Sequence, residues 1–142
     1  MNTVSSLLSH KGRTLISVSP DTSVVDALKL MAEKNIGSVI VFQDNQYLGI
    51  VTERDYSRKI ALKGKNSALT TVSEIMSSDL PSVNPADSIE YCMELMTIKN
   101  IRYMPVFENN KLAGIVSMSD VVKETILAQK ETISQLQSYI QS

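Results

Sequence analysis

Cysteine, histidine, tryptophan and glycine are scarce in this chain of 142 residues, which contains one Cys, one His, no Trp and five Gly. The single Cys92 excludes an internal disulfide and a cysteine-rich zinc site. His10 has no second histidine with which to share a metal ion, and no serine has the base and orienting acid that a catalytic nucleophile needs. The scattered glycines form no phosphate-binding loop. These absences argue against an enzyme.

Long apolar runs and an excess of one charge are missing too. No stretch approaches the roughly 18 apolar residues of a membrane span, and residues 1–12 are too polar for a signal peptide. Lys and Arg number 14 against 15 Asp and Glu, without the basic cluster typical of nucleic-acid binding. With 43% hydrophobic residues, the chain can bury a core. We expect a cytoplasmic protein with neither a membrane nor a nucleic-acid partner.

What the sequence does contain is an internal repeat. Residues 18–58 align without a gap with residues 83–123 at a constant offset of 65, and Pro20/Pro85 and Gly49/Gly114 are among the identical pairs. Upstream, residues 3–5 resemble residues 71–73 at an offset of 68. Self-similarity of this length indicates two copies of one structural unit. We predict repeat 1 over 1–62, a linker over 63–70, repeat 2 over 71–127 and a C-terminal helical extension over 128–142.

Each copy has the pattern strand, helix, strand, strand, helix, which predicts a mixed α/β fold. Good N-cap residue types stand at the start of the first helix, Asp21-Thr22-Ser23 in the first copy and Asp87-Ser88 in the second, and Asn35 and Asn100 are suited to end it. One copy cannot cover both faces of its small sheet, so we expect the two copies to pair. The strands are expected at 15–18, 38–42 and 47–51 in the first copy, and at 81–83, 103–107 and 112–116 in the second.

The most informative local motif is Gly-Ile-Val-[Thr/Ser]-x-x-Asp, which occurs at 49–55 and again at 114–120. In one interpretation, Thr52 and Ser117 cap a helix, and Asp55 and Asp120 complete a capping box. In the other, the same helix start favours a phosphate and the carboxylate accepts hydrogen bonds from a ribose diol. The two interpretations are compatible, because one carboxylate can serve both purposes.

The doubled pattern, with this motif after each hairpin, resembles the CBS domain, named for cystathionine β-synthase. The resemblance covers residues 3–127, and the stretches 30–37, 51–56 and 99–106 are similar to bacterial stand-alone proteins with two CBS domains. It implies a pseudo-two-fold pair with two clefts that bind adenosyl ligands such as AMP, ADP, ATP, NAD(H) or S-adenosylmethionine. One cleft often takes its base-framing residues and its aspartate from different copies.

The resemblance also implies roles for particular residues. Asp55 and Asp120 would hold ribose, with Thr52 and Ser117 beside the ribose or phosphate. Arg54 and Arg102 are the best phosphate partners, because a guanidinium matches phosphate oxygens in pairs, and Lys11 and Arg13 are weaker candidates. The residues expected to frame adenine are Thr14, Ile16, Val18, Ser38, Val39, Ser82, Val83, Tyr103, Met104 and Pro105.

The two copies differ at positions that bear on binding. Ile40 stands where the family commonly has the proline seen at Pro105. Arg102 replaces Gly37, and Ser119 replaces Arg54. We therefore expect the two clefts to differ in affinity or in ligand.

The C-terminal stretch has an apolar stripe at alternating steps of four and three residues, from Val122 to Ile140. This spacing is typical of a helix that packs against a second helix. The stripe either packs back on its own domain or meets a second subunit, and we predict a homodimer to which the helix contributes. Cys92 falls on the apolar face of the first helix of repeat 2, so we expect it to pack in the core.

The leading functional hypothesis is a non-catalytic sensor of an adenine nucleotide, AMP first, that controls an unidentified partner protein through a ligand-dependent conformational change. One alternative is a redox sensor that prefers NAD(H). Another is a structural subunit whose clefts stay empty. The presence of both aspartates argues against this second alternative.

Overall fold

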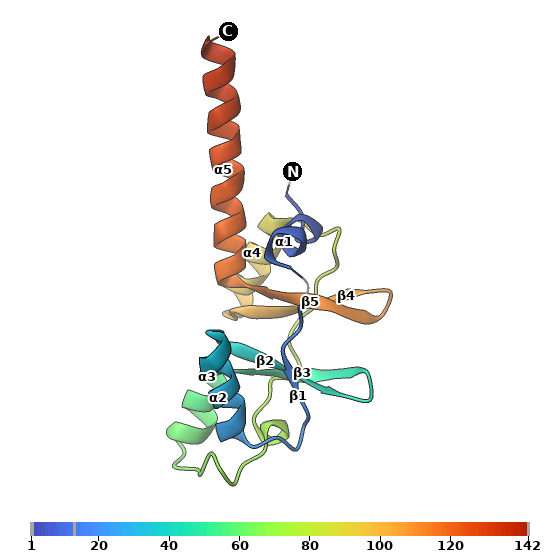
Figure 1. The fold of residues 1–142 in the computed structure, drawn as a ribbon, viewed down its shortest axis with the longest axis vertical. Coiled ribbons are helices and arrows are strands. Elements are labelled where there is room, and N and C mark those ends of the chain that lie inside the picture. Colours follow the sequence, from blue (N-terminus) through green and yellow to red (C-terminus); the bar gives the residue numbers. More distant parts are fainter. Residues whose placement is uncertain (1, 13, 142) are drawn as a thin grey trace. The chain divides into compact units, whose positions relative to one another are not determined.

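The computed structural model describes residues 2–12 and 14–141, which form two compact units. Unit 1 consists of Met1–Thr14 and Pro81–Ser142, and unit 2 consists of Leu15–Leu80. Each unit is built around one β-hairpin with helices beside it (Figure 1). The fold is mixed α/β, as the repeat pattern predicts.

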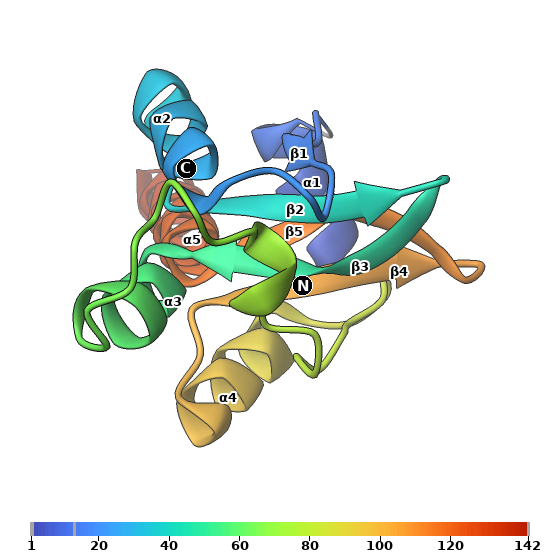
Figure 2. The ribbon, with the colours of Figure 1, turned by 90° about the horizontal axis from the view of Figure 1, so that it is seen from below.

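Unit 2 contains a three-stranded sheet in the order β1-β2-β3. Strand β2 pairs parallel with β1 and antiparallel with β3, and Figure 2 shows the hairpin of β2 and β3 from below. The helix after β3 begins as an α-helix and continues as a π-helix. The elements are β1 (Ser17–Val18), α2 (Val24–Lys34), β2 (Ser38–Gln43), β3 (Gln46–Thr52), α3 (Glu53–Tyr56), the π-helix η1 (Ser57–Ala61) and the 3₁₀-helix η2 (Val72–Glu74).

Unit 1 contains a two-stranded antiparallel sheet and a long last helix. Its elements are α1 (Val4–Lys11), α4 (Ile89–Lys99), β4 (Tyr103–Glu108), β5 (Lys111–Ser117) and α5 (Met118–Gln141). Helix α5 has 24 residues, so at 1.5 Å per residue it extends for roughly 36 Å.

The expected first strand is complete in neither unit, and it is shorter in unit 1. Strand β1 covers only Ser17–Val18, and its counterpart is a single parallel bridge between Val83 and Val106. In unit 2 the Ile40 N–H donates to the Ile16 carbonyl at 3.0 Å. Pro105 aligns with Ile40 and has no N–H, so the equivalent bond cannot form in unit 1.

The lead-in segment of each repeat packs in the unit that contains the other repeat's hairpin. The Val4 N–H donates to the Asp87 carbonyl at 2.9 Å, and the Val72 N–H donates to the Thr22 carbonyl at 2.8 Å. Ser5 and Ser73 N–H groups likewise donate to the carbonyls of the two aligned prolines. These bonds repeat at the offsets of 68 and 65 found in the sequence. The lead-in segments therefore occupy equivalent positions in the two units.

Local sequence signals are confirmed at the helix ends and turns. Ser23 and Ser88 accept hydrogen bonds from backbone N–H groups as N-caps of α2 and α4. Asn35 and Asn100 end these helices with φ of 53° each, in the left-handed region that asparagine tolerates. The hairpin turns use Asp44-Asn45 and Asn109-Asn110, all four at positive φ, as two-residue hairpins favour.

Each unit has its own core. In unit 2 the core includes Val24, Ala27 and Met31 from α2, together with Val39, Val41 and Val51 from the sheet. In unit 1 it includes Cys92, which is 0% exposed and is packed among apolar side chains, as expected. Burial raises the pKa of the Cys92 thiol to about 11. No helix in the described part of the chain is long and apolar enough to span a membrane.

Candidate functional site

Both motif aspartates lie in the first turn of a helix and are held by the backbone of the motif itself. The Thr52 N–H donates to Asp55 Oδ2 at 3.0 Å, and the Asp55 N–H donates back to Thr52 Oγ1 at 3.1 Å. In unit 1 the Ser117 N–H donates to Asp120 Oδ2 at 3.0 Å, and the Asp120 N–H donates to Ser117 Oγ at 3.0 Å. The capping interpretation of the motif is confirmed in both units.

Asp55 is almost enclosed by groups of unit 2. Besides the two groups of Thr52, Ser77 Oγ donates to Asp55 Oδ1 at 2.9 Å and Lys59 Nζ lies 3.0 Å from the same oxygen. Lys59 Nζ also donates to the Ile75 carbonyl at 2.8 Å. Both carboxylate oxygens are thus engaged, and the Asp55 side chain is 7% exposed.

Asp120 is more open than Asp55 and has a different cation. Lys11 Nζ, at the end of α1, donates to Asp120 Oδ2 at 2.6 Å and to the Ile115 carbonyl at 2.8 Å. Among the described residues, the Lys11 ammonium and the Ser117 N–H both bond the same carboxylate oxygen, Oδ2, and the Asp120 side chain is 16% exposed. Burial raises the pKa of this carboxyl, but the hydrogen bonds from Lys11 and Ser117 outweigh it and the pKa is lowered.

Strand register brings the start of each hairpin opposite the motif hydroxyl. Ser38 pairs with Thr52, and Tyr103 pairs with Ser117. The chain then continues into the helix while bonded to the residue before the hairpin: the Glu53 N–H donates to the Gly37 carbonyl, and the Met118 N–H donates to the Arg102 carbonyl. Val39 and Met104 follow in the strands and are buried. Each unit therefore gathers its hairpin start, hydroxyl and aspartate at one end of the sheet.

The remaining expected adenine-framing residues lie along the first-strand segments. Ile16 and Val18 are half-buried beside β2, where the Ile16 carbonyl accepts from the Ile40 N–H. Thr14 and Ser82 are exposed. Val83 is buried, and its N–H donates to the Pro105 carbonyl at 3.1 Å. Some of the backbone groups expected to frame adenine, the Ile16 carbonyl and the Val83 N–H, therefore already form hydrogen bonds within their own units.

The candidate phosphate partners occupy different environments. Arg54 is half-buried in the first turn of α3, and Arg102 is exposed immediately before β4. Lys11 is committed to Asp120 and Ile115, and Arg13 lies outside the described residues. Sequence reasoning missed Lys59 as the partner of Asp55, although its position four residues later on a helix is a known spacing for ion pairs.

A second polar cluster joins α1 to α5 in unit 1. Glu124 is 4% exposed, and its two carboxylate oxygens lie 2.9 Å and 3.0 Å from His10 Nδ1. Asn2 Nδ2 donates to the same carboxylate at 3.4 Å. The hydrogen bond to Glu124 and its charge raise the pKa of His10. Nothing in the sequence near His10 indicates this partner, which lies 114 residues away.

The motif glycines admit close neighbours that a side chain would displace. A Cβ built at Gly49 would lie 2.7 Å from the Ser77 backbone carbonyl oxygen. A Cβ at Gly114 would lie 2.8 Å from Leu8 Cδ2. Both neighbours belong to lead-in segments, so the glycine of the motif is required by tertiary packing rather than by its own backbone angles.

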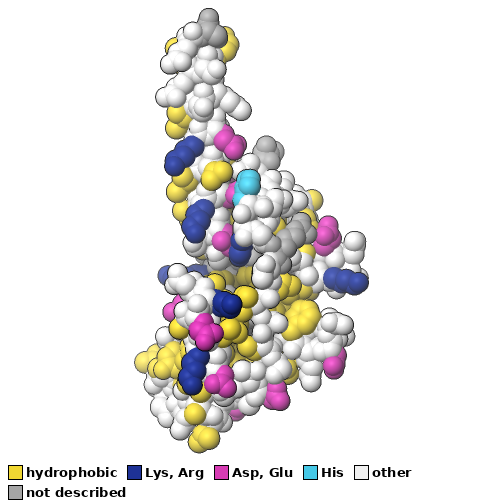
Figure 3. All heavy atoms as spheres, viewed as in Figure 1, with side chains coloured by type: hydrophobic (Ala, Val, Ile, Leu, Met, Phe, Trp, Pro, Cys, Tyr) yellow, Lys and Arg dark blue, Asp and Glu magenta, His cyan; other side chains and the backbone are white. Residues whose placement is uncertain are grey.

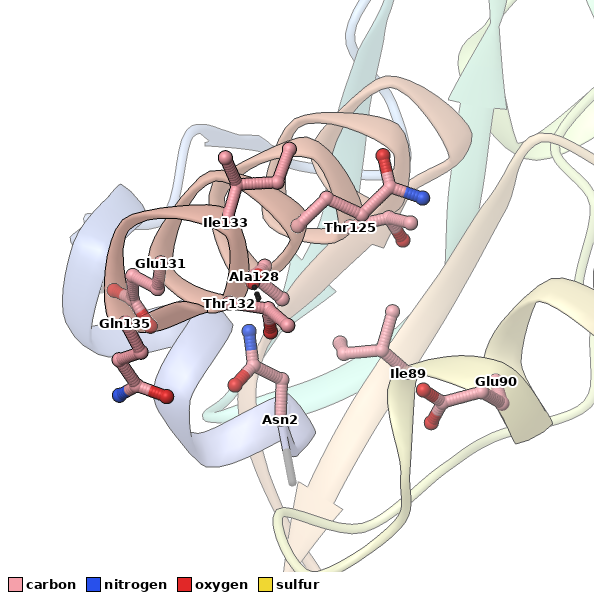
Figure 4. A pocket seen from close by; sticks show the side chains of 10 residues that line it. Asn2, Ile89, Glu90, Thr125, Ala128, Glu131, Thr132, Ile133 and Gln135 are labelled. Carbon is pink, nitrogen blue, oxygen red and sulfur yellow. Dashed lines mark hydrogen bonds between the residues drawn. The ribbon is translucent and has the colours of Figure 1, made fainter. Parts of the chain in front are cut away.

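Unit 1 also has a groove of about 650 Å³ beside α5 (Figure 4). It is lined by residues of α5, by Ile89 and Glu90 at the start of α4, and by Asn2. None of the motif residues lines it. No group of three or more His, Cys, Asp or Glu residues that could hold a metal ion occurs in residues 2–12 and 14–141.

The comparisons with known proteins agree with this geometry. The family described as CBS domain matches residues 6–62 and 72–126. The chain is 34% identical over 148 residues to the mitochondrial CBS domain-containing protein CBSX3 of Arabidopsis thaliana, covering 98% of this chain and 72% of the relative.

Two solved structures extend the comparison. A protein with CBS domains from Burkholderia ambifaria is 43% identical, with a TM-score of 0.85 over 90% of this chain and 96% of that one. A hexameric CBS-CP12 protein from bloom-forming cyanobacteria is 32% identical, with a TM-score of 0.74 over 86% of this chain and 70% of that one. The chain belongs to the CBS-domain family and carries two CBS domains in tandem.

Proposed function

We propose that this chain is a non-catalytic regulatory module that binds an adenine nucleotide through the carboxylates of Asp120 and Asp55. AMP is the leading candidate for this ligand. The proposal is carried by the repeated carboxylate, which in both units is fixed by the N–H of the hydroxyl residue three positions earlier. A carboxylate held in this way is suited to accept two hydrogen bonds from a ribose 2′,3′-diol, because hydrogen bonds to a charged acceptor are strong. The membership of the CBS-domain family supports the ligand class.

The two aspartates differ in what they offer a ligand, and we expect Asp120 to bind more tightly. Among residues 2–12 and 14–141 the bonds from Lys11 and the Ser117 N–H go to Oδ2, so Asp120 can offer Oδ1 to a ribose hydroxyl, whereas a ribose at Asp55 must displace Ser77 or Lys59 from Oδ1. Around Asp120 we assign Ser117 to the ribose and Arg102 to the phosphate. Tyr103, Met104, Pro105, Ser82 and Val83 are proposed adenine contacts.

In unit 2 we expect the same kinds of contact with the nucleotide but a lower affinity. Thr52 and Asp55 would contact ribose, and Arg54 would contact phosphate. Thr14, Ile16, Val18, Ser38 and Val39 are the other proposed adenine contacts. The bound nucleotide would then favour one conformation of the module, and a regulated protein must bind the two conformations with different affinity for the signal to be read.

The proposal is tested by calorimetric titration of the full chain with AMP, ADP, ATP, NAD⁺, NADH and S-adenosylmethionine. Asp120→Asn keeps an acceptor for the Ser117 N–H but removes the charge, so we expect about a 10-fold loss of AMP affinity, the difference between a charged and a neutral hydrogen bond. Asp55→Asn should cost less. Ser88→Ala is the matched control: it removes the N-cap of α4, about 1 kcal/mol of stability, and leaves affinity unchanged.

The alternatives give different results in the same titration. Tighter binding of NADH than of AMP would identify a redox sensor. A folded wild-type chain that binds none of the six ligands would overturn the proposal and leave both aspartates as helix caps.

A further inference from the structure

The exposed end of α5 carries a stripe of branched apolar side chains. Residues 129–141 are all exposed, and Figure 3 shows hydrophobic side chains along the helix. Ile126 is 46% exposed and Ile140 is 80% exposed. An apolar helix face in water gains nothing from packing, which supplies most of the stability of helices in proteins. The described residues of the same chain leave this face uncovered.

We propose that the stripe binds the same stripe of a second copy, so that two α5 helices form a parallel, in-register, two-stranded coiled coil. The alternating steps of four and three residues assign the side chains to heptad positions. Ile126, Ile133 and Ile140 all fall at position a, and Leu136 falls at position d. β-branched residues at a with leucine at d favour two parallel strands.

Gln129 specifies the register of the pair. It falls at position d, between Val122 and Leu136, and it is the polar member of the stripe. In a parallel in-register pair, Gln129 faces its own copy, and two amides can each donate and accept a hydrogen bond. A shifted register or an antiparallel pair places the amide against an apolar side chain, where the lost hydrogen bonds are costly.

The charges beside the stripe favour the same orientation. Lys123 and Lys130 fall at position e. In an antiparallel pair the e positions face one another, which places lysine against lysine. In a parallel pair, Lys130 lies beside position g of the other copy, which is Thr125. Parallel pairing therefore avoids the repulsion.

The groove of unit 1 offers a complementary surface for that lysine. Thr125 lines the groove together with Glu90 and Glu131 (Figure 4). The described residues that line it include these two carboxylates and no cation. The ammonium group of Lys130 from a second copy, entering beside Thr125, would meet the carboxylate of Glu90 on α4, whereas Glu131 falls at position f, away from the partner helix. This match commits the stripe to a second copy of the same chain.

Orientation is tested by cross-linking the full chain under mild oxidation with oxidised glutathione. In a parallel pair Ile140→Cys meets its own copy within the Cα separation that a disulfide allows, about 4.4–6.8 Å, so we expect a disulfide-linked dimer. In an antiparallel pair it lies far from its copy and does not cross-link. Ser138→Cys, at position f on the opposite side of the helix, is the control. Cys92 is buried with a raised pKa and does not compete.

Association is tested by sedimentation equilibrium without nucleotide over a range of concentrations, because the stripe spans fewer than three heptads. We expect a dimer, about 100-fold weakened by Ile133→Asp with Leu136→Asp and unchanged by Ser134→Asp with Ser138→Asp. Lys130→Glu and Glu90→Lys should each weaken the dimer about 10-fold, and together they should restore it. Far-UV circular dichroism checks that α5 stays helical in each variant.

Three results would overturn the inference: a wild-type monomer at every concentration, an odd-numbered assembly, or an oligomer in which Ile140→Cys fails to cross-link. A monomer that still binds AMP would leave the nucleotide proposal standing. A dimer that binds no nucleotide would leave the coiled coil standing and overturn the nucleotide proposal.

Discussion

Units 1 and 2 hold an equivalent aspartate with different elements. In unit 2, Ser77 bridges Ile50 through its backbone and donates to Asp55 through its hydroxyl, while Lys59 supplies the positive charge. In unit 1, one side chain, that of Lys11, bonds both the Ile115 carbonyl, which aligns with that of Ile50, and Asp120. The carboxylate position is set by its own helix cap. The neutralising group can therefore come from any element that reaches it.

At one aligned position the two units carry residues of opposite charge. Lys59 aligns with Glu124 at the offset of 65, so the charge is reversed between the units. In unit 1 the partners of the two carboxylates come instead from the end of α1, where His10 faces Glu124 and Lys11 faces Asp120. A repeat can thus carry opposite charges at one aligned position when a partner of opposite sign arrives from elsewhere in the chain.

The largest expected difference between the units concerns their motif glycines. Gly49→Ala places a Cβ against the backbone carbonyl of Ser77, which cannot move without breaking the bridge to Ile50. Gly114→Ala meets the end of the Leu8 side chain, which can rotate. We expect losses of about 3 kcal/mol and about 1 kcal/mol respectively, measured by urea unfolding. Equal losses would show that the Ser77 backbone and the Leu8 side chain make room for a Cβ equally well.

The lysine partners should differ by a smaller amount. Lys59→Met leaves the nearly buried Asp55 with only neutral donors, and we expect a loss of about 2 kcal/mol, reduced from the value for a buried pair because Lys59 is 39% exposed. Lys11→Met should cost about 1 kcal/mol, since Asp120 is better solvated. A larger loss for Lys11→Met would contradict the view that Asp55 is the more enclosed carboxylate.

Acid unfolding sharpens the same comparison. The pKa of Asp120 is lowered, so its contribution to stability is present above its unfolded pKa and is lost as pH falls through the folded pKa, below 3.8. Removing Lys11 weakens this lowering. Lys11→Met should therefore begin to lose the Asp120 contribution at a higher pH than wild type, measured by thermal unfolding between pH 5 and pH 2.5. Lys29→Met, on an exposed face of α2, is the control.

The proline difference predicts a reciprocal exchange in the first strands. Ile40→Pro removes the N–H that bonds Ile16, and we expect a loss of about 1–2 kcal/mol. Pro105→Ile supplies the missing donor and should extend the pairing of Val83 toward residue 81. Amide hydrogen exchange reports both changes, as faster exchange around β1 and slower exchange around residues 81–83. Unchanged exchange in Pro105→Ile would mean that the proline does not limit this strand.

The smallest expected effect concerns His10. Its pKa is raised above 6.5 by Glu124, so its contribution to stability is complete below pH 6.5 and is lost as pH rises through the folded pKa. The titratable and charged groups around it are Glu124, Glu131 and its neighbour Lys11. We expect the thermal midpoint to fall between pH 6 and pH 8.5 in wild type and less so in His10→Gln. The same slope in both would assign the pH dependence to other groups.

The homology between the two copies made much of the fold predictable. What could not be predicted is confined to contacts between segments distant in the chain. Helix caps, asparagine turns and the capping boxes of Asp55 and Asp120 depend on residues within four positions of one another, and all are confirmed. Sequence spacing could also have shown Lys59. It could not have shown that Lys11, Ser77 or His10 reach their partners, because these contacts join segments distant in the chain. The binding roles of the site residues and the cytoplasmic location stay predictions.

By itself the sequence determined two CBS domains, their helices and hairpins, and the position of one aspartate at each helix start. These follow from local capping, turn chemistry and apolar periodicity, which act over a few residues. Only the tertiary structure decided that each lead-in segment packs in the unit of the other repeat's hairpin, that a glycine must face it, and which cation neutralises each aspartate. These depend on which distant backbones come within hydrogen-bonding distance, and that distance is set by the packing of whole units.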